Sequence, residues 1–169
     1  TLLSLINDIL DLSKIEAGKM EIQFHPIPPL SIFTDIKEIF SQKVEQKGLN
    51  FIMEVDPNLP EELLLDEIRI RQILFNLVGN AVKFTHEGYI KLSVHKFFTK
   101  EDKSSIRLEF VVEDSGIGIP EDQQAHIFDP FIQQKGQDTG KYGGTGLGLN
   151  ITRRLVEMMG GKITLDSEV

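Results

Sequence analysis

The stretch Asn76-Leu77-Val78-Gly79-Asn80-Ala81-Val82-Lys83-Phe84 carries two amides and an ammonium at helical spacing. Asn76 and Asn80 are four residues apart and Lys83 follows three residues later, so the three side chains share one helix face. Buried amides are costly unless they are hydrogen-bonded, and for the pair alone structural bonds to neighbouring loops are the simpler explanation. With Lys83, however, the face suits a magnesium ion and phosphate oxygens, because an amide oxygen is a hard ligand and an ammonium a point charge.

A second motif, Asp114-Ser115-Gly116-Ile117-Gly118-Ile119, follows a strongly apolar stretch over residues 108–112. Gly116 and Gly118 permit a tight backbone turn, and Asp-Ser-Gly is also common in ordinary turns. The alternative is a carboxylate at the floor of a pocket. There Asp114 would accept a hydrogen bond from an exocyclic amine, which favours adenine over guanine.

The third motif is Gly143-Gly144-Thr145-Gly146-Leu147-Gly148-Leu149, with four glycines in six residues directly before a predicted helix. Exposed backbone N–H groups at a helix N-terminus form an anion site. The motif is neither a Walker loop, because no Gly-Lys-Ser/Thr follows, nor a Rossmann fingerprint, because a polar loop precedes it. The alternative is a flexible linker followed by a helix start. Lys135 and Lys141, in the loop before the motif, would be solvated or could reach a phosphate.

Composition limits the classes of protein that need consideration. The chain has 169 residues, 40% of them hydrophobic, and 11 phenylalanines, which predicts a globular core with an appended element. Its net charge of −8 argues against nucleic-acid binding, and the absence of cysteine excludes disulfides and thiolate metal sites. We find no signal peptide and no bilayer-length apolar run. Because the chain begins within a helical pattern, we expect it to be part of a longer protein.

Hydrophobic periodicity, caps and breakers predict an α/β architecture, a two-layer sandwich in which helices cover one face of a mixed sheet. Asp66 is the predicted N-cap of the helix that carries the two amides. We expect helices over residues 1–19, 30–47, 66–84, 120–128 and 147–159, and strands over residues 20–24, 50–55, 89–98, 106–113 and 162–166.

The ordered set of motifs strongly resembles the catalytic, ATP-binding domain of sensor histidine kinases, in the wider GHKL (Bergerat) group that includes gyrase, MutL and the heat-shock chaperone ATPases. The resemblance covers nearly the whole chain. Residues 66–85 resemble the N box, 114–118 the first glycine box, 127–131 the F box, and 140–149 the lid and second glycine box. Residues 11–19 are similar to the end of the second dimerisation helix. The resemblance implies a mostly antiparallel Bergerat-type sheet.

The resemblance also implies roles for individual residues. Asn80 would bind Mg²⁺, Asn76 would lie beside the phosphates, Lys83 would touch the phosphate chain and Asp114 would bind the adenine amino group. Phe128 and Phe131 would anchor the base of the lid, although from the residues alone they are simply core aromatics. The nucleotide-binding residues that we expect are Asn76, Asn80, Lys83, Asp114, Gly116, Gly118, Ile119, Lys141, Gly144, Thr145, Gly146, Leu147 and Gly148.

One position distinguishes activities within this group. The members that hydrolyse ATP typically carry a glutamate where this chain has Asn76, and an amide cannot act as a general base at neutral pH. Asn76 therefore favours phosphoryl transfer to a separate acceptor, a protein-histidine kinase, over hydrolysis. Two alternatives stay open: an ATPase of the gyrase or MutL type, and a non-catalytic interaction module.

The sequence context of the histidines excludes a phosphoacceptor within the chain. None of His25, His86, His95 and His126 has the expected His-Glu/Asp-x-Arg-Thr-Pro context. We expect no catalytic residue here, and an acceptor histidine upstream of Thr1.

The resemblance sets further expectations for the whole protein. Residues 1–19 would end a truncated dimerisation bundle, and residues 20–169 would form the catalytic domain without its last strand. ATP, Mg²⁺, a response regulator receiver domain and a second copy through the bundle are the expected partners. The expected setting is a cytoplasmic part of a membrane-anchored or larger multidomain sensor.

Overall fold

A computed structural model of the chain describes residues 2–98, 105–132 and 145–169. The chain forms two compact units, each described by itself below. The sheet unit is Phe24–Ile117, and the helical unit is Thr1–Gln23 together with Gly118–Val169. The predicted domain boundary between residues 19 and 20 differs from this division, in which residues 1–23 group with residues 118–169. That boundary stays a prediction.

The sheet unit is built on three strands in the order β2-β4-β5. Strand β2 (Asn50–Val55) runs parallel to β4 (Tyr89–Phe98), and β4 pairs antiparallel with β5 (Ile106–Asp114). A separate antiparallel pair joins β1 (His25–Ile27) to β3 (Leu63–Leu65). Pairing is therefore mixed and mostly antiparallel, as expected.

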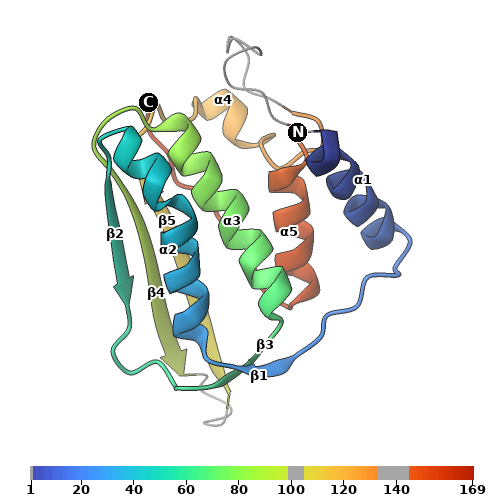
Figure 1. The fold of residues 1–169 in the computed structure, drawn as a ribbon. Coiled ribbons are helices and arrows are strands. Elements are labelled where there is room, and N and C mark those ends of the chain that lie inside the picture. The colour runs from blue at the N-terminus through green and yellow to red at the C-terminus, as the bar shows by residue number, and fades with distance from the viewer. Residues whose placement is uncertain (1, 99–104, 133–144) are drawn as a thin grey trace. The chain divides into compact units, whose positions relative to one another are not determined.

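Two helices of the sheet unit, α2 (Pro29–Gln46) and α3 (Glu67–Phe84), cover one face of the three-stranded sheet (Figure 1). Alternate residues of β4 point toward them, and Ile90, Leu92 and Val94 are fully buried. Phe33 of α2 and Val78 of α3 are fully buried as well. Each such side chain contributes about 1.5–3 kcal/mol to folding. The predicted two-layer α/β fold is thus confirmed.

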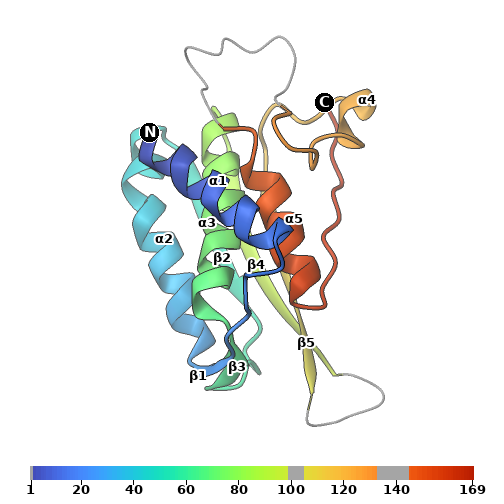
Figure 2. The same ribbon diagram turned by 90° about the vertical axis from the view of Figure 1, so that its right-hand side faces the viewer.

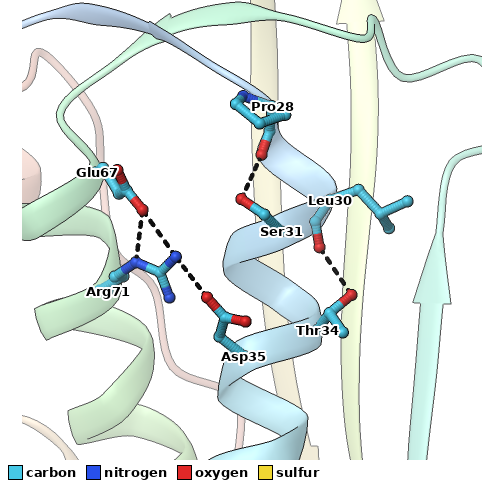
Figure 3. Close-up of polar contacts among 7 residues, drawn as sticks. All are labelled: Pro28, Leu30, Ser31, Thr34, Asp35, Glu67 and Arg71. Carbon is cyan, nitrogen blue, oxygen red and sulfur yellow. Dashed lines mark hydrogen bonds and ion pairs between the residues drawn. The ribbon is translucent and has the colours of Figure 1, made fainter.

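The first turn of α3 is fixed by a cap and by an ion pair to α2. The Asp66 carboxylate accepts a hydrogen bond from the backbone N–H of Arg69 at 3.1 Å, which confirms the predicted N-cap. One turn further on, Nη2 of Arg71 lies 2.7 Å from both Asp35 of α2 and Glu67 of α3 (Figure 3). Arg71 therefore ties the two helices together near the N-terminal end of α3.

The helical unit contains α1 (Leu2–Glu16), the short α4 (Glu121–Gln124) and α5 (Gly148–Met158). Helices α1 and α5 lie side by side in this unit (Figures 1 and 2). Leu147, Ile151 and Leu155 are buried at helical spacing, and Met20 of the same unit is buried as well. The predicted N-terminal helix is confirmed, and its apolar residues include five exposed ones: Leu2, Leu3, Ile6, Ile9 and Leu10.

Two expected strands are absent from the described residues, and one observed strand was not expected. Residues 20–24 form no strand; the ladder begins at His25, which pairs with Leu65, and it includes Pro26. A two-stranded pair tolerates this proline because an edge position needs no N–H donor there. The sequence analysis missed β3, and residues 162–166 form no strand because they have no ladder partner among the described residues.

Helix α4 is also shorter than expected. It ends at Gln124 rather than near Phe128. The next residues form turns, in which the N–H of His126 bonds to the carbonyl of Gln123 and the N–H of Asp129 to that of His126. These bonds span three residues, not four, and so do not continue an α-helix.

Candidate functional site

Helix α3 of the sheet unit carries the two amides and the ammonium predicted from the sequence. Asn76 and Asn80 are half-buried one turn apart, and Lys83 is half-buried in the last turn. The helix holds them because Leu74, Val78 and Val82, on its opposite face, are buried in the core. The expected common face of amides and ammonium is therefore present.

Lys83 is an ammonium in a partly desolvated position. Burial lowers the pKa of Lys83 from its ordinary value, because desolvation disfavours the charged form. Its Nζ atom lies 4.5 Å from the centroid of the Phe84 ring, within cation–π range. An anionic ligand beside Lys83 would offset this desolvation, which makes Lys83 suited to a phosphate.

Asp114 ends β5, and its carboxylate is held by two hydrogen bonds within the sheet unit. Oδ1 accepts from the backbone N–H of Gly116 at 2.9 Å and from the hydroxyl of Thr85 at 3.3 Å. Both bonds use Oδ1, so among the described residues Oδ2 is the oxygen that can accept from a ligand. The Asp114 side chain is exposed, and the two hydrogen bonds to Oδ1 fix its orientation.

Gly116 brings this carboxylate against the end of α3. A Cβ atom at Gly116 would lie 2.6 Å from Asp114 Oδ1 and 2.8 Å from the carbonyl oxygen of Phe84. Ser115 closes the same turn, because its hydroxyl donates to Glu87 O at 3.0 Å and accepts from the N–H of Tyr89 at 2.9 Å. The end of the N box and the start of the first glycine box are therefore in contact.

Gly118 and Ile119 belong to the helical unit, where the C-terminal residues hold them. Gly118 has φ +66°, and a Cβ there would lie 1.9 Å from the carbonyl oxygen of Glu168. The N–H of Ile119 donates to the hydroxyl of Ser167 at 2.9 Å. Glycine is required at residue 118 by both conformation and space.

The described part of the second glycine box, from Thr145 to Gly148, leads into α5 of the helical unit. The hydroxyl of Thr145 accepts from the N–H of Leu147 at 3.2 Å and donates to the Asp8 carboxylate at 2.9 Å. Gly146 has φ +70°, and its carbonyl accepts from the N–H of Phe131 at 2.9 Å. Gly148 is the first residue of α5, as an anion site at a helix start requires. Lys141 and Gly144, also expected in the site, and Lys135 lie outside the described residues.

The two aromatics of the F box behave differently. Phe128 is half-buried, and its carbonyl accepts a hydrogen bond from the amide of Asn150 at 2.8 Å. The Phe131 side chain is 65% exposed, and its φ of +63° is rare for a non-glycine residue. The interpretation of Phe131 as a core aromatic is therefore wrong.

The structure brings some of the predicted residues together within one unit. Asn76, Asn80, Lys83, Asp114 and Gly116 belong to the sheet unit, whereas residues 118, 119 and 145–148 belong to the helical unit. That all of them line one site stays a prediction.

Two residues whose contacts the sequence analysis missed meet at the end of α3. Thr85 directly follows this helix, and Lys47, which follows α2, donates from its ammonium to carbonyl oxygens of residues 82, 83 and 85. Thr85 could have been noticed because it directly follows the N-box helix. Lys47 carried no local signal beyond its place before a helix-ending glycine.

Metal binding by clustered acidic or histidine side chains is not supported. Within residues 2–98, 105–132 and 145–169, no group of three or more His, Cys, Asp or Glu side chains could hold a metal ion. An amide oxygen such as that of Asn80 is a hard ligand of the kind that a divalent cation accepts together with oxygens of a bound ligand.

The comparisons with known proteins agree with this picture. Residues 65–169 match the family described as histidine kinase-, DNA gyrase B- and HSP90-like ATPase. The chain belongs to this family. Within it, the chain is homologous to the ATP-binding catalytic domain of sensor histidine kinases, as its relatives show.

Two Escherichia coli sensor kinases illustrate the relationship. The signal transduction histidine-protein kinase BarA is 40% identical over 167 residues, which cover 99% of this chain and 18% of BarA. The aerobic respiration control sensor protein ArcB is 41% identical over 169 residues, covering 99% of this chain and 21% of ArcB. The chain thus spans about a fifth of the length of these relatives. Neither is a gyrase or MutL protein, and the comparisons do not support those alternatives.

Comparison with solved structures supports the same assignment to the catalytic domain of sensor histidine kinases. Full-length ShkA in complex with AMPPNP aligns with a TM-score of 0.78 and 36% identity, covering 94% of this chain and 31% of ShkA. The histidine kinase ThkA in complex with the response regulator protein TrrA aligns with a TM-score of 0.64 and 28% identity, covering 95% of this chain and 43% of that chain.

Among the described helices, none is long and apolar enough to cross a membrane.

Proposed function

We propose that this chain binds ATP with Mg²⁺ and positions the γ-phosphate for transfer to a histidine outside residues 1–169, as the catalytic part of a sensor histidine kinase. The observation that carries the proposal is the placement of Asp114. Its carboxylate is fixed by Thr85 and Gly116 against the end of the helix that bears Asn76, Asn80 and Lys83. ShkA, a relative in structure and sequence, was solved with the ATP analogue AMPPNP.

Asp114 would recognise the base. Oδ2 would accept a hydrogen bond from the exocyclic amine of adenine. Guanine has a carbonyl oxygen at that position, and this oxygen cannot donate a hydrogen bond. Two bonds to Oδ1 hold the carboxylate in place, so the recognising oxygen is already oriented before the nucleotide arrives. A pre-oriented acceptor spends less binding energy on ordering.

The phosphates and the metal would be held by α3 and by backbone donors. Asn80 would supply an amide oxygen to Mg²⁺, Asn76 would lie beside the phosphates and Lys83 would offset phosphate charge. From the helical unit, residues 144–148 would add backbone N–H groups at the start of α5, together with Lys141, and Gly118 and Ile119 would complete the set.

The chemistry that these groups can perform is charge stabilisation and positioning. Mg²⁺ would neutralise developing charge on the β- and γ-phosphate oxygens, and phosphoryl transfer needs little covalent help from the protein. Asn76 cannot take a proton from water, so this arrangement does not activate water for hydrolysis. The acceptor would be a histidine with its own nucleophilic nitrogen.

The setting of the whole protein is proposed from its relatives. Residues 1–19 would end a helical bundle through which two copies associate, and residues 20–169 would form the catalytic domain. The solved complex of ThkA with TrrA supports a response regulator receiver domain as the later phosphate acceptor. We place the chain in the cytoplasmic part of a larger sensor protein.

Calorimetric titration with AMPPNP and Mg²⁺ tests the proposal, with Asp114→Asn as the variant and Glu109→Gln, an exposed change on the same strand, as the control. An asparagine has one acceptor oxygen instead of two. If that oxygen keeps the bonds from Gly116 and Thr85, an NH2 group faces the adenine amine, so we expect affinity to fall about tenfold or more.

Unchanged affinity in Asp114→Asn would contradict the assigned base contact. Release of inorganic phosphate from ATP by the isolated chain, abolished by Asn76→Ala, would instead support an ATPase. With radiolabelled ATP the chain alone should take up no label, whereas label transferred to a longer form of the protein with an acceptor histidine would support the kinase assignment.

A further inference from the structure

Lys47 caps the C-terminal end of α3 from a different helix. It directly follows α2, and its Nζ atom lies 2.6 Å from the carbonyl oxygen of Val82, 3.2 Å from that of Lys83 and 3.0 Å from that of Thr85. In Figure 1 the C-terminal ends of α2 and α3 lie at the same end of the helix pair. All of these residues belong to the sheet unit.

The ammonium matches the requirements of this helix end. The last four carbonyls of a helix have no intrahelical partner, and the C-terminus carries a partial negative charge. The N–H of Thr85 closes the last bond of α3, to Ala81 at 3.0 Å, so the carbonyls beyond Ala81 need other donors. An ammonium has three N–H donors, and Lys47 directs them at three of these carbonyls.

The position of Lys47 is set by the end of its own helix. Its N–H bonds to the carbonyl of Lys43 at 3.2 Å, and Gly48 follows with φ +66°. The N–H of Leu49 then bonds to the carbonyl of Val44 at 3.0 Å, and Leu49 is buried. This C-terminal cap anchors the chain on both sides of Lys47 and aims its side chain toward α3.

The carbonyls that Lys47 binds belong to residues next to the candidate site. Lys83 is the ammonium proposed to contact phosphate, and Thr85 donates to the Asp114 carboxylate at 3.3 Å. A shift of the last turn of α3 would therefore move the phosphate contact and release the adenine contact together.

We propose that Lys47 is a positioning residue of the nucleotide site, which fixes Lys83 and Thr85 by capping three carbonyls at the end of α3. This inference rests on the proposed function, because it takes α3 and Asp114 to bind ATP. Lys47 itself touches neither base nor phosphate in this assignment. Its effect passes through the backbone of the last helical turn.

The test compares Lys47→Met with two other lysine variants. Methionine keeps the length of the side chain but has no donor, Lys47→Arg keeps charge and donors, and Lys43→Met removes an exposed lysine one turn earlier. Titration with AMPPNP and Mg²⁺ should show about tenfold weaker binding for Lys47→Met, because hydrogen bonds to a charged group are lost. Lys47→Arg should restore most of the affinity, and Lys43→Met should bind like the unaltered chain.

A second readout separates positioning from stability. We expect Lys47→Met to prefer ATP over GTP less strongly, because Asp114 loses the orientation that Thr85 gives it. Both affinities are measured well below the unfolding temperature, where loss of stability alone would not change the preference. If Lys47→Met does not fold, Lys47→Gln, which keeps two N–H donors without charge, should show an intermediate affinity.

The outcomes distinguish the two proposals. Failure of the unaltered chain to bind AMPPNP would overturn the proposed function and this inference with it. Binding by the unaltered chain, with the same affinity and the same preference for ATP in Lys47→Met or Lys47→Gln, would overturn the role of Lys47 alone.

Discussion

The hydroxyl of Thr85 donates a hydrogen bond of 3.3 Å to Oδ1 of Asp114, and so joins the residue that directly follows α3 to the last residue of β5. The Thr85 side chain is fully buried, whereas Asp114 is exposed. A buried donor thus holds an exposed acceptor in place. This contact makes the orientation of the carboxylate depend on the helix that carries the proposed phosphate contacts.

Replacing Thr85 with valine should weaken nucleotide binding while leaving the fold intact. Valine has nearly the same shape, so the buried site stays filled, and the loss of one hydrogen bond should cost about 1 kcal/mol of stability. The freed Asp114 carboxylate must be ordered when adenine binds, so we expect AMPPNP affinity to fall about three- to tenfold. Titration and urea unfolding measure the two effects. Thr85→Ser, which keeps the hydroxyl, is the control, and equal affinities in the two variants would contradict the role of the hydroxyl.

An alanine at residue 116 should disturb the site by crowding. Its Cβ would lie 2.6 Å from Asp114 Oδ1 and 2.8 Å from the Phe84 carbonyl, both well inside van der Waals contact. The carbonyl belongs to the last turn of α3 and can move only with that turn. We expect Gly116→Ala to lower the free energy of unfolding by about 1–3 kcal/mol and to weaken AMPPNP binding. An unaltered urea midpoint together with unaltered affinity would show that the turn and the helix are not in this contact.

Gly79→Ala, within α3, should stabilise the fold, in contrast to the change at residue 116. A Cβ at Gly79 would lie 3.6 Å from Cζ of Phe40, an ordinary contact. Glycine in a helix interior is less favourable than alanine by about 0.5–1 kcal/mol, so we expect the variant to be more stable by about that amount. Urea unfolding at neutral pH measures the change. A less stable variant would mean that the Phe40 ring cannot accept the added methyl group.

The parts of the fold that the sequence predicts are those with local signals. The N-cap at Asp66, the alternation along β4 and the glycine after α2 each identify an element, because the cause lies within a few residues of its effect. Asn76, Asn80 and Lys83 were identifiable for the same reason, since helical spacing alone places them on one face.

The features that the sequence did not reveal depend on contacts between distant segments. The pairing of β1 with β3 joins residues about forty positions apart. Thr85 and Lys47 acquire their roles only because β5 and α2 end beside α3. Conversely, residues 162–166 have the composition of a strand but no ladder partner among the described residues. Composition favours a strand, and only a neighbouring strand completes it.

Lys83→Met should separate stability from binding. Burial lowers the pKa of Lys83 in the folded chain, so in the alkaline range below about 10.4 the unfolded chain binds more protons than the folded one. The Lys83 contribution therefore makes the free energy of unfolding rise with pH through that range, and at neutral pH its charge is a cost. Methionine removes this cost. Its sulfur can replace the contact with the Phe84 ring, since sulfur–aromatic contacts are worth about 0.3–1.5 kcal/mol and exposed cation–π contacts about 0.5–1 kcal/mol.

We therefore expect Lys83→Met to unfold at a higher urea concentration than the unaltered chain at pH 7, and this advantage should shrink as the pH approaches 10. AMPPNP affinity should fall at the same time, because the phosphate chain loses a positive partner. Lys37→Met, an exposed change on α2, should alter neither property. A Lys83 variant that is less stable at pH 7 would mean that the cation–π contact with Phe84 outweighs desolvation, and unaltered affinity would remove Lys83 from the phosphate site.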